Sequence, residues 1–430
     1  MTRRRRRRLA APAALVAALL LLLVPAAARA DDPPPAISAR SAIVVETSTG
    51  DVAFARRAST RRQIASTTKM MTALVSREKL PLGKTIRAAP YAALPVESKI
   101  NLRTGEPMRV ADLLRALMLE SANDAAVTLA VGASGSRQAF VRQMNAKAQD
   151  LGLENTRFAN PVGLDDPDNY STAADLATLA TAVRRDEFLR RTVALPSARL
   201  KTGDRPRVIA NRNTLVRSGF ANGVKTGHTN RAGYLLVGSK TRAGINVVSV
   251  VMGEPSEAAR DADSRALLAW ALSRYERERV LDRDKVIATV PIKYRDTNVG
   301  VISTREISRV VRKGSGLDVK VTGLPEEVDG PLPAGSRAGV AVVSEGGRVI
   351  ARVPLVTANA VPEAGVWLKV KDGMSGKWWI PGLLVLVLAG TLLALVLRHR
   401  AARRRELEAE RRRASRERAR AAFEEQSPVA

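Results

Sequence analysis

The sequence predicts three successive parts: a mixed domain of helices and strands, a small all-β domain, and one helix long enough to cross a membrane. From Ser41 onward, short β-like runs alternate with helical patterns, as in α/β or α+β domains. After about Val280 only short apolar runs remain, separated by glycine, proline and aspartate. Trp378–Leu397 then gives 20 residues without a charge, which is the length a helix needs to cross hydrocarbon.

The composition excludes several classes of protein and of site. The 430-residue chain has a formal net charge of +28, no cysteine and two histidines, His228 and His399. Without cysteine there is no disulfide, zinc–thiolate site, iron–sulfur cluster or cysteine nucleophile. Two histidines leave almost no material for a histidine metal site or a Ser-His-Asp triad, so we expect no metal and no cofactor. Aromatic residues make up 3% of the chain, too few for a base-stacking surface, so we expect no nucleic-acid partner.

Residues 1–30 have the pattern of a secretory signal peptide. Arg3–Arg8 is a basic run, Leu9–Val24 is apolar, and Ala28-Arg29-Ala30 places small residues before a cleavage site at Asp31. A retained membrane anchor is the alternative, but the apolar stretch is short for a span. The pattern therefore predicts that the chain is exported.

A transmembrane helix is predicted at residues 378–397, followed by a basic cytoplasmic tail at residues 398–430. The Trp378-Trp379 pair suits a membrane interface, and Pro381 lies near the first turn, where a helix tolerates proline. A buried helix of a soluble protein is the alternative, but its flanks would not differ so much in charge. Eleven arginines in the tail favour the cytoplasmic side. We therefore expect a single-pass cell-membrane protein with residues 31–377 on the extracytoplasmic side.

The mixed domain is expected over residues 36–277. Ser41–Glu46 and Val52–Arg56 predict a hairpin, and Tyr234–Ser239 and Asn246–Met252 predict a second one. Helical patterns begin after Ser66 and recur at Val110–Leu119, Asp124–Val131, Ser136–Leu151, Thr172–Arg185 and Ser256–Arg277.

The β-rich domain is expected over residues 280–372. Regular short strands without helices indicate a small all-β sandwich or barrel. We interpret it as a stalk that holds the first domain away from the membrane. The expected strands are Lys285–Ile292, Val299–Ser303, Leu317–Val321, Gly339–Val343 and Val349–Leu355.

Ser66 and Lys69 form the first of three short polar patterns. Three residues apart, they share one face of a helix, with the serine near its N-terminus. The helix dipole favours negative charge at the serine oxygen, and a desolvated lysine can lose its proton near neutral pH. The pair therefore suits a nucleophile and its base. The same spacing recurs at Ser76 and Lys79, which we interpret as a solvated helix face.

Ser121-Ala122-Asn123, the second pattern, lies between two helical segments. A hydroxyl and an amide on a loop can relay a proton and hold a substrate amide. An ordinary helix cap is the alternative, and the spacing alone favours it.

Lys225-Thr226-Gly227, followed by His228, is the third pattern and is expected at a strand edge beside a hairpin. A cation and a hydroxyl on a strand can clamp a substrate carboxylate, while glycine lets the substrate backbone approach. A second copy, Lys201-Thr202-Gly203, lies in a polar stretch with no apolar strand around it, so we discount it.

The ordered triplet resembles the serine acyl-transferases that include penicillin-binding proteins and class A β-lactamases. The chain from about Ile37 to Tyr275 resembles the D-alanyl-D-alanine carboxypeptidase family more closely. This implies an α+β domain of the serine β-lactamase and penicillin-binding-protein type, an antiparallel sheet packed with helices. The β-rich segment is similar to that family's second domain. The segments that carry the resemblance are Ala65–Leu74, Ser121–Ala126, Phe158–Asp165, Asn211–Leu215 and Gly223–Thr229.

The resemblance implies a serine peptidase that removes the terminal D-alanine from peptidoglycan stem peptides. Ser66 would form an acyl-enzyme, with Lys69 as its base. Ser121 would pass a proton toward the leaving D-alanine, and Asn123 would hold the substrate amide.

The third pattern would bind the substrate's C-terminus. The resemblance implies that Lys225 and Thr226, next to Gly227, bind the terminal carboxylate. The backbone N–H groups of Ser66 and His228 would form the oxyanion hole.

β-Lactams are expected to be inhibitors rather than substrates. The chain has no Glu-x-x-Leu-Asn segment like the one that supplies a deacylating carboxylate in class A β-lactamases, so penicillin would acylate Ser66 and stay bound. Two alternatives remain: a transpeptidase or endopeptidase that uses the same site, and a non-catalytic cell-wall scaffold.

Overall fold

The structure is a computed structural model that describes residues 33–375 and 379–424, so the expected signal peptide and Trp378 lie outside the described residues. The described chain divides into two compact units. The first comprises residues 33–279 and 308–317, and the second comprises residues 280–307 and the chain from residue 318 onward. The domain boundaries expected from the sequence stay a prediction.

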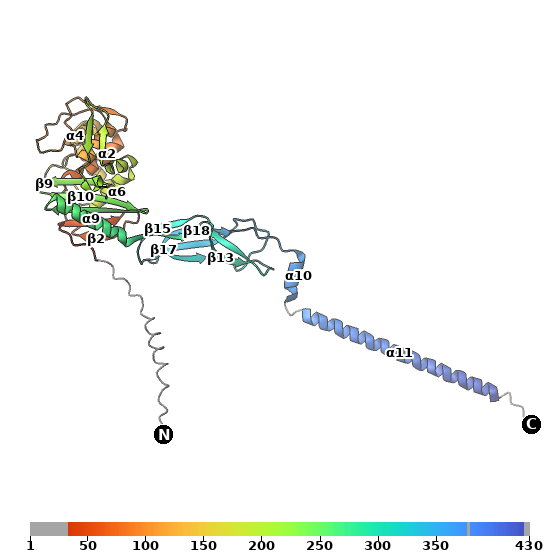
Figure 1. Cartoon of the computed structure of the whole chain (residues 1–430). Helices are drawn as coiled ribbons and strands as arrows, with labels where there is room; N and C mark the ends of the chain where they lie inside the picture. The colour runs from red at the N-terminus through yellow and green to blue at the C-terminus, as the bar shows by residue number, and fades with distance from the viewer. Residues whose placement is uncertain (1–32, 376–378, 425–430) are drawn as a thin grey trace, which may run out of the picture. The chain divides into compact units, whose positions relative to one another are not determined.

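An antiparallel five-stranded sheet forms the centre of the first unit (Figure 1). Its strand order is β2-β1-β11-β10-β9, so the first and last strands of the unit's sheet lie side by side. Both hairpins predicted from the sequence are confirmed, since β1 pairs with β2 and β10 pairs with β11. The strands are β1 (Ser41–Glu46), β2 (Val52–Arg56), β9 (Val224–Thr229), β10 (Gly233–Arg242) and β11 (Ile245–Glu254).

The inner strands β1 and β11 are buried on both faces, which explains why they are almost continuously apolar. Ile43 packs into one hydrophobic cluster, whereas its neighbours Ala42 and Val44 pack into another on the opposite face. Figure 1 shows α9 on one side of the sheet and α2 and α4 on the other. These helices are α2 (Lys69–Lys79), α4 (Asn123–Ser134) and α9 (Glu257–Arg274). The sheet and its two helical layers confirm the α+β class.

Further helices and short strands complete the first unit. The helices are η2 (Ala65–Thr68), α3 (Val110–Arg115), η3 (Ala116–Glu120), α5 (Arg137–Asp150), α6 (Ala173–Arg185), α7 (Glu187–Val193) and α8 (Thr214–Arg217). Three two-stranded sheets are formed by β3 (Arg62–Gln63) with β6 (Tyr170–Ser171), β4 (Thr85–Arg87) with β5 (Pro107–Arg109), and β7 (Ser197–Leu200) with β8 (Arg207–Ala210).

The helix expected at Ser256–Arg277 ends earlier than predicted. Ser256 caps α9, since its hydroxyl accepts from Ala259 N at 3.1 Å, but the helix stops at Arg274. Strand β12 (Tyr275–Leu281) follows directly and pairs with β15 (Ile307–Arg312). Tyr275 is buried and its hydroxyl donates to Asp51 Oδ2 at 2.6 Å, so tertiary contacts override the local helical pattern there.

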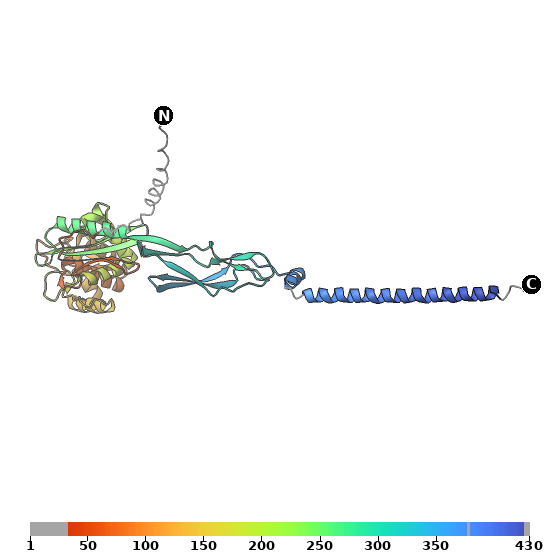
Figure 2. The ribbon, with the colours of Figure 1, turned by 90° about the horizontal axis from the view of Figure 1, so that it is seen from below.

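The second unit is built on a five-stranded sheet of order β13-β14-β18-β17-β16 (Figure 2). Each β-rich run expected from the sequence forms one of these strands, and the small all-β domain is confirmed. The strands are β13 (Val286–Pro291), β14 (Asn298–Ser303), β16 (Asp318–Thr322), β17 (Arg337–Glu345) and β18 (Arg348–Thr357).

Two helices follow the second sheet. They are α10 (Val366–Ser375) and α11 (Trp379–Glu424), and α11 is one continuous helix (Figure 2). Its stretch Trp379–Ala419 contains a window of mean hydropathy 2.7 that is not buried within the protein. By length and composition, α11 is a candidate membrane anchor.

Candidate active site

Ser66 and Lys69 meet where η2 passes into α2. Lys69 Nζ lies 3.0 Å from Ser66 Oγ and 2.5 Å from the carbonyl oxygen of Val162. Lys69 is fully buried, whereas Ser66 is partly exposed. The helical face predicted from the spacing therefore places an amine against a reachable hydroxyl.

The segment that follows Asn160 forms the wall behind Lys69. Asn160 Oδ1 accepts from Val162 N and Gly163 N, and this turn presents the Val162 carbonyl to Lys69. Gly163 has φ +87°, and a Cβ there would lie 2.0 Å from the carbonyl oxygen of Ala65. Only glycine fits this position, so the close approach of the two segments depends on it.

The environment of Lys69 favours its neutral form. Burial lowers the pKa of Lys69 well below its usual value, and the positive charge of Lys225 lowers it further. Glu97 and Asp124 act in the opposite direction. A lysine whose pKa is depressed in this way can accept a proton from a neighbouring hydroxyl.

Ser121 and Lys225 form a second pair, although they are far apart in sequence. Lys225 Nζ lies 3.0 Å from Ser121 Oγ and is buried on β9. Burial, followed by the charges of Arg212 and Arg260, lowers the pKa of Lys225 to about 7. Ser121 has φ +65° and ψ +30°, a left-handed conformation that is costly outside glycine. The residue is thus held at the site in a strained backbone conformation.

Neither Ser121 nor Asn123 caps the start of α4 with its side chain, whereas Ser121 is the C-cap residue of η3, where its backbone N–H donates to the carbonyl oxygen of Ala116. The N-cap of α4 is Ala122, and no side chain accepts a hydrogen bond at that position. The capping alternative therefore holds only for the backbone of Ser121, and the side chains of both residues make other contacts.

Asn123 is held by two residues that the sequence analysis missed. Its Nδ2 donates to Glu97 Oε2 at 2.6 Å, and the Tyr91 hydroxyl donates to the same oxygen. Burial raises the pKa of Glu97, but the hydrogen bonds from Tyr91 and Asn123 outweigh it and lower the pKa overall. Glu97 lies in a polar loop outside any motif, so no pattern in the sequence could identify it.

Strand β9 brings the third pattern against the serine. A Cβ at Gly227 would lie 3.2 Å from the carbonyl oxygen of Ile64 and 3.3 Å from Ser66 N, so glycine permits the approach. Thr226 is buried beside Lys225, while the His228 ring is exposed and stacks on Tyr234 with 3.9 Å between ring centroids.

A further contact closes the far end of β9. Thr229 Oγ1 donates to Asp165 Oδ1 at 2.7 Å, which joins the strand to the segment that carries Val162 and Gly163. The structure therefore brings seven of the eight candidate residues into one cluster, in which Lys225 acts electrostatically on Lys69, while the His228 ring points to Tyr234 and only its backbone adjoins the cluster.

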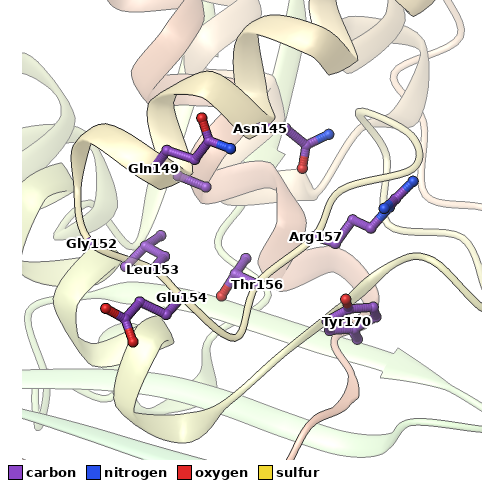
Figure 3. Close-up of a pocket in the computed structure, with 9 residues that line it drawn as sticks. Asn145, Gln149, Gly152, Leu153, Glu154, Thr156, Arg157 and Tyr170 are labelled. Carbon is purple, nitrogen blue, oxygen red and sulfur yellow. The ribbon is translucent and has the colours of Figure 1, made fainter.

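Two further observations bear on what the site can hold. Among residues 33–375 and 379–424, no group of three or more His, Asp or Glu side chains could hold a metal ion. A cavity of about 620 Å³ lies elsewhere, and Figure 3 shows the polar side chains around it. None of the eight candidate residues lines this cavity, whose polar lining includes Asn145, Gln149, Glu154, Thr156, Arg157 and Tyr170.

Two family descriptions match successive parts of the chain. Residues 27–256 match D-alanyl-D-alanine carboxypeptidase, and residues 275–363 match penicillin-binding protein 5, C-terminal domain. Among curated proteins, D-alanyl-D-alanine carboxypeptidase DacF of Bacillus subtilis is 33% identical over 350 residues, covering 79% of this chain and 90% of that protein. DacA of Escherichia coli is 32% identical over 352 residues, covering 78% and 87%.

Solved structures agree with this match. Penicillin binding protein 5 from Haemophilus influenzae superposes with a TM-score of 0.57 at 31% identity, covering 77% of this chain and 99% of that one. A serine-to-alanine mutant of the Streptomyces K15 DD-transpeptidase gives a TM-score of 0.54 at 31% identity, covering 56% of this chain and 99% of that one.

Proposed function

This chain belongs to the D-alanyl-D-alanine carboxypeptidase family, and on that premise we propose the role of each residue in its site. Its activity is that of a serine-type D-alanyl-D-alanine carboxypeptidase. The proposed substrate is the peptidoglycan stem peptide, from which the enzyme removes the terminal D-alanine. The observation that carries the residue roles is the 3.0 Å distance between Lys69 Nζ and Ser66 Oγ inside a buried polar cluster.

Acylation begins at Ser66. Neutral Lys69 takes the proton of Ser66 Oγ, and the oxygen attacks the carbonyl carbon between the two terminal D-alanines. The backbone N–H groups of Ser66 and His228 bind the negative charge that develops on the carbonyl oxygen. The close approach of Gly227 to Ser66 N supports this role, because it brings the two segments of the oxyanion hole to short range.

The leaving D-alanine is handled by the second pair. Lys225 and Thr226 bind its carboxylate, and that negative charge raises the pKa of Lys225 so that it binds as a cation. Ser121, 3.0 Å from Lys225 Nζ, gives its proton to the amine as the C–N bond breaks. Ser121 then takes up the proton that Lys69 accepted from Ser66, which returns Lys69 to its neutral form. Asn123 holds the amide of the acyl part. Water then attacks the ester, gives its proton to Lys69, and Ser66 Oγ regains a proton as it leaves.

The test of this proposal is the full chain with Ser66→Ala. We expect release of D-alanine from a pentapeptide ending in D-alanyl-D-alanine to fall by about 10³-fold or more, and labelling by fluorescent penicillin to vanish. Ser76→Ala is the matched control, because Ser76 belongs to the second copy of the Ser-x-x-Lys spacing in α2. Ser76 is fully buried, so the interpretation of this copy as a solvated helix face is wrong for the serine. Survival of both signals in Ser66→Ala would overturn the assignment of the nucleophile.

Transpeptidation is a second candidate activity of the same site. The similarity to the Streptomyces K15 DD-transpeptidase favours it, since an acyl-enzyme can be intercepted by an amine in place of water. Adding an acceptor amine to the pentapeptide assay separates the two: a new peptide bond indicates transfer, and free tetrapeptide alone indicates hydrolysis.

The chain is also proposed to cross the membrane once. The apolar first part of α11 supports a span, and the arginines after Leu397 support a cytoplasmic tail with the catalytic unit outside. The chain has no cysteine, so single substitutions can report the side of each part. We expect a membrane-impermeant maleimide to label Ser315→Cys in intact cells and Ser415→Cys only after lysis. Labelling of both in intact cells would contradict this topology.

A further inference from the structure

A cavity of about 500 Å³ lies beside the candidate active site, against the first turns of α5. Its walls combine apolar and cationic side chains. Val127, Val141 and Leu164 give an apolar surface, while Arg137 and Arg142 bring two guanidinium groups. On α5 the neighbours of these arginines at i,i+4, Val141 and Gln138, also line the cavity, so one broad helix face is turned toward it.

Three contacts connect this cavity with the catalytic cluster. Val162 lines it, and the carbonyl oxygen of the same residue accepts from Lys69. Tyr91 lines it, and its hydroxyl donates to the carboxylate that holds Asn123. Val127 lies one helical turn beyond Asn123 on α4. A peptide held at Asn123 therefore has the cavity within reach of its next side chain.

The charge of the cavity is unbalanced. Arg137 and Arg142 have no hydrogen-bond or ion-pair partner anywhere in the described chain, and no acidic residue lines the cavity. Three other cavities in the first unit are each lined by an acidic residue as well as by arginine. The residues are Glu154 and Arg157 in one, Glu254, Arg40 and Arg231 in the second, and Asp150 and Arg185 in the third. The cavity next to the catalytic residues thus presents uncompensated positive charge over an apolar wall.

We propose that this cavity binds a side chain of the acyl-donor peptide, and that this side chain is aliphatic and ends in a carboxylate. The guanidinium groups match a carboxylate through paired hydrogen bonds, and the apolar wall takes the methylene groups before it. The inference rests on the proposed function, because Asn123 holds the donor amide there. It makes Arg137 and Arg142 specificity-determining residues.

The test compares two synthetic peptides on the full chain. Both end in D-alanyl-D-alanine, and the residue before carries either a 2-aminoadipate side chain or its primary amide. We expect wild type to prefer the carboxylate peptide by about tenfold in kcat/KM, mainly through KM, as for charge-assisted hydrogen bonds at an exposed rim. In Arg137→Gln/Arg142→Gln that ratio falls to near one. Raising the salt concentration should also reduce it in wild type.

Arg109→Gln is the matched control, because Arg109 is exposed, lies in the same unit and does not line the cavity. A ratio in the double variant within twofold of the wild-type value overturns the proposal, and so does an equal loss on both peptides. A wild-type enzyme without preference also overturns it. Failure of wild type to hydrolyse either peptide is a different result, since it contradicts the proposed function itself.

Discussion

The tripeptide Lys-Thr-Gly occurs twice in the first unit, and the two copies have different roles. Lys225-Thr226-Gly227 lies on β9 at the candidate active site, whereas Lys201-Thr202-Gly203 follows β7. Lys225 is 1% exposed, while Lys201 is on the surface. The same three residue types therefore differ between the two copies in burial and in the residues that surround them.

Each copy uses its polar atoms for a different purpose. At β9 the ammonium of Lys225 faces the Ser121 hydroxyl. In the second copy, the backbone N–H groups of Lys201 and Thr202 and the Thr202 hydroxyl all donate to Asp112 Oδ2, at 2.9, 3.1 and 2.8 Å. That copy anchors a loop to α3 by satisfying a buried carboxylate. The comparison shows that the tripeptide alone does not fix the burial and the neighbours on which the proposed binding role of Lys225-Thr226-Gly227 depends.

Replacing the two lysines gives the largest expected difference between the copies. Lys225→Gln should lower kcat/KM for D-alanine release by about 10²-fold to 10³-fold, because it removes the buried cation proposed to bind the carboxylate. Lys201→Gln, at the surface, should change it by less than about twofold. Steady-state kinetics on the pentapeptide measure both. Equal losses in the two variants would break the comparison.

Replacing the two glycines should separate catalysis from stability. Gly227→Ala places a Cβ at 3.2–3.3 Å from backbone atoms beside Ser66, so we expect kcat/KM to fall by about tenfold with little change in stability. Gly203 has φ +98°, and a Cβ there would lie 2.4 Å from Glu106 Oε1. Gly203→Ala should therefore lower the free energy of unfolding by about 1–3 kcal/mol with little effect on kcat/KM. Thermal unfolding and steady-state kinetics of both variants test this prediction. A loss of stability in Gly227→Ala together with a loss of kcat/KM in Gly203→Ala would contradict it.

The smallest expected effect comes from Glu97→Gln, which tests why the buried Lys69 can act as a base. The charged groups that act on Lys69 are Lys225, which lowers its pKa, and Glu97 and Asp124, which raise it. Glu97→Gln removes a negative charge, so the pKa of Lys69 should fall further. In the proposed mechanism activity needs the neutral amine of Lys69, so the acid limb of the pH profile of kcat/KM should move to lower pH. The rate near neutral pH should fall by about threefold to tenfold, because Asn123 is held less firmly.

Tyr91→Phe is the matched control for that experiment. It removes one hydrogen bond to Glu97 but keeps the carboxylate, so the acid limb should stay near its wild-type position. If the acid limb of the pH profile does not move in Glu97→Gln, the Glu97 carboxylate has no electrostatic effect on Lys69.

Much of the fold could be predicted from the sequence because it depends on local patterns. The two hairpins and the five strands of the β-rich unit appear where runs of apolar residues alternate with turn residues. The errors fall where tertiary contacts dominate. Helix α9 ends at Arg274 because Tyr275 is drawn into a buried contact with Asp51, which no local pattern records.

By itself the sequence determined the order of the parts and the three polar patterns, because residue type and spacing carry that information. Only the tertiary structure decided that Glu97 and Tyr91 hold Asn123, that Ser121 adopts a left-handed conformation, and that Arg137 and Arg142 face a cavity. The physical reason is that these features depend on distances between segments far apart in the chain. Burial, hydrogen-bond geometry and a shifted pKa arise when such segments meet.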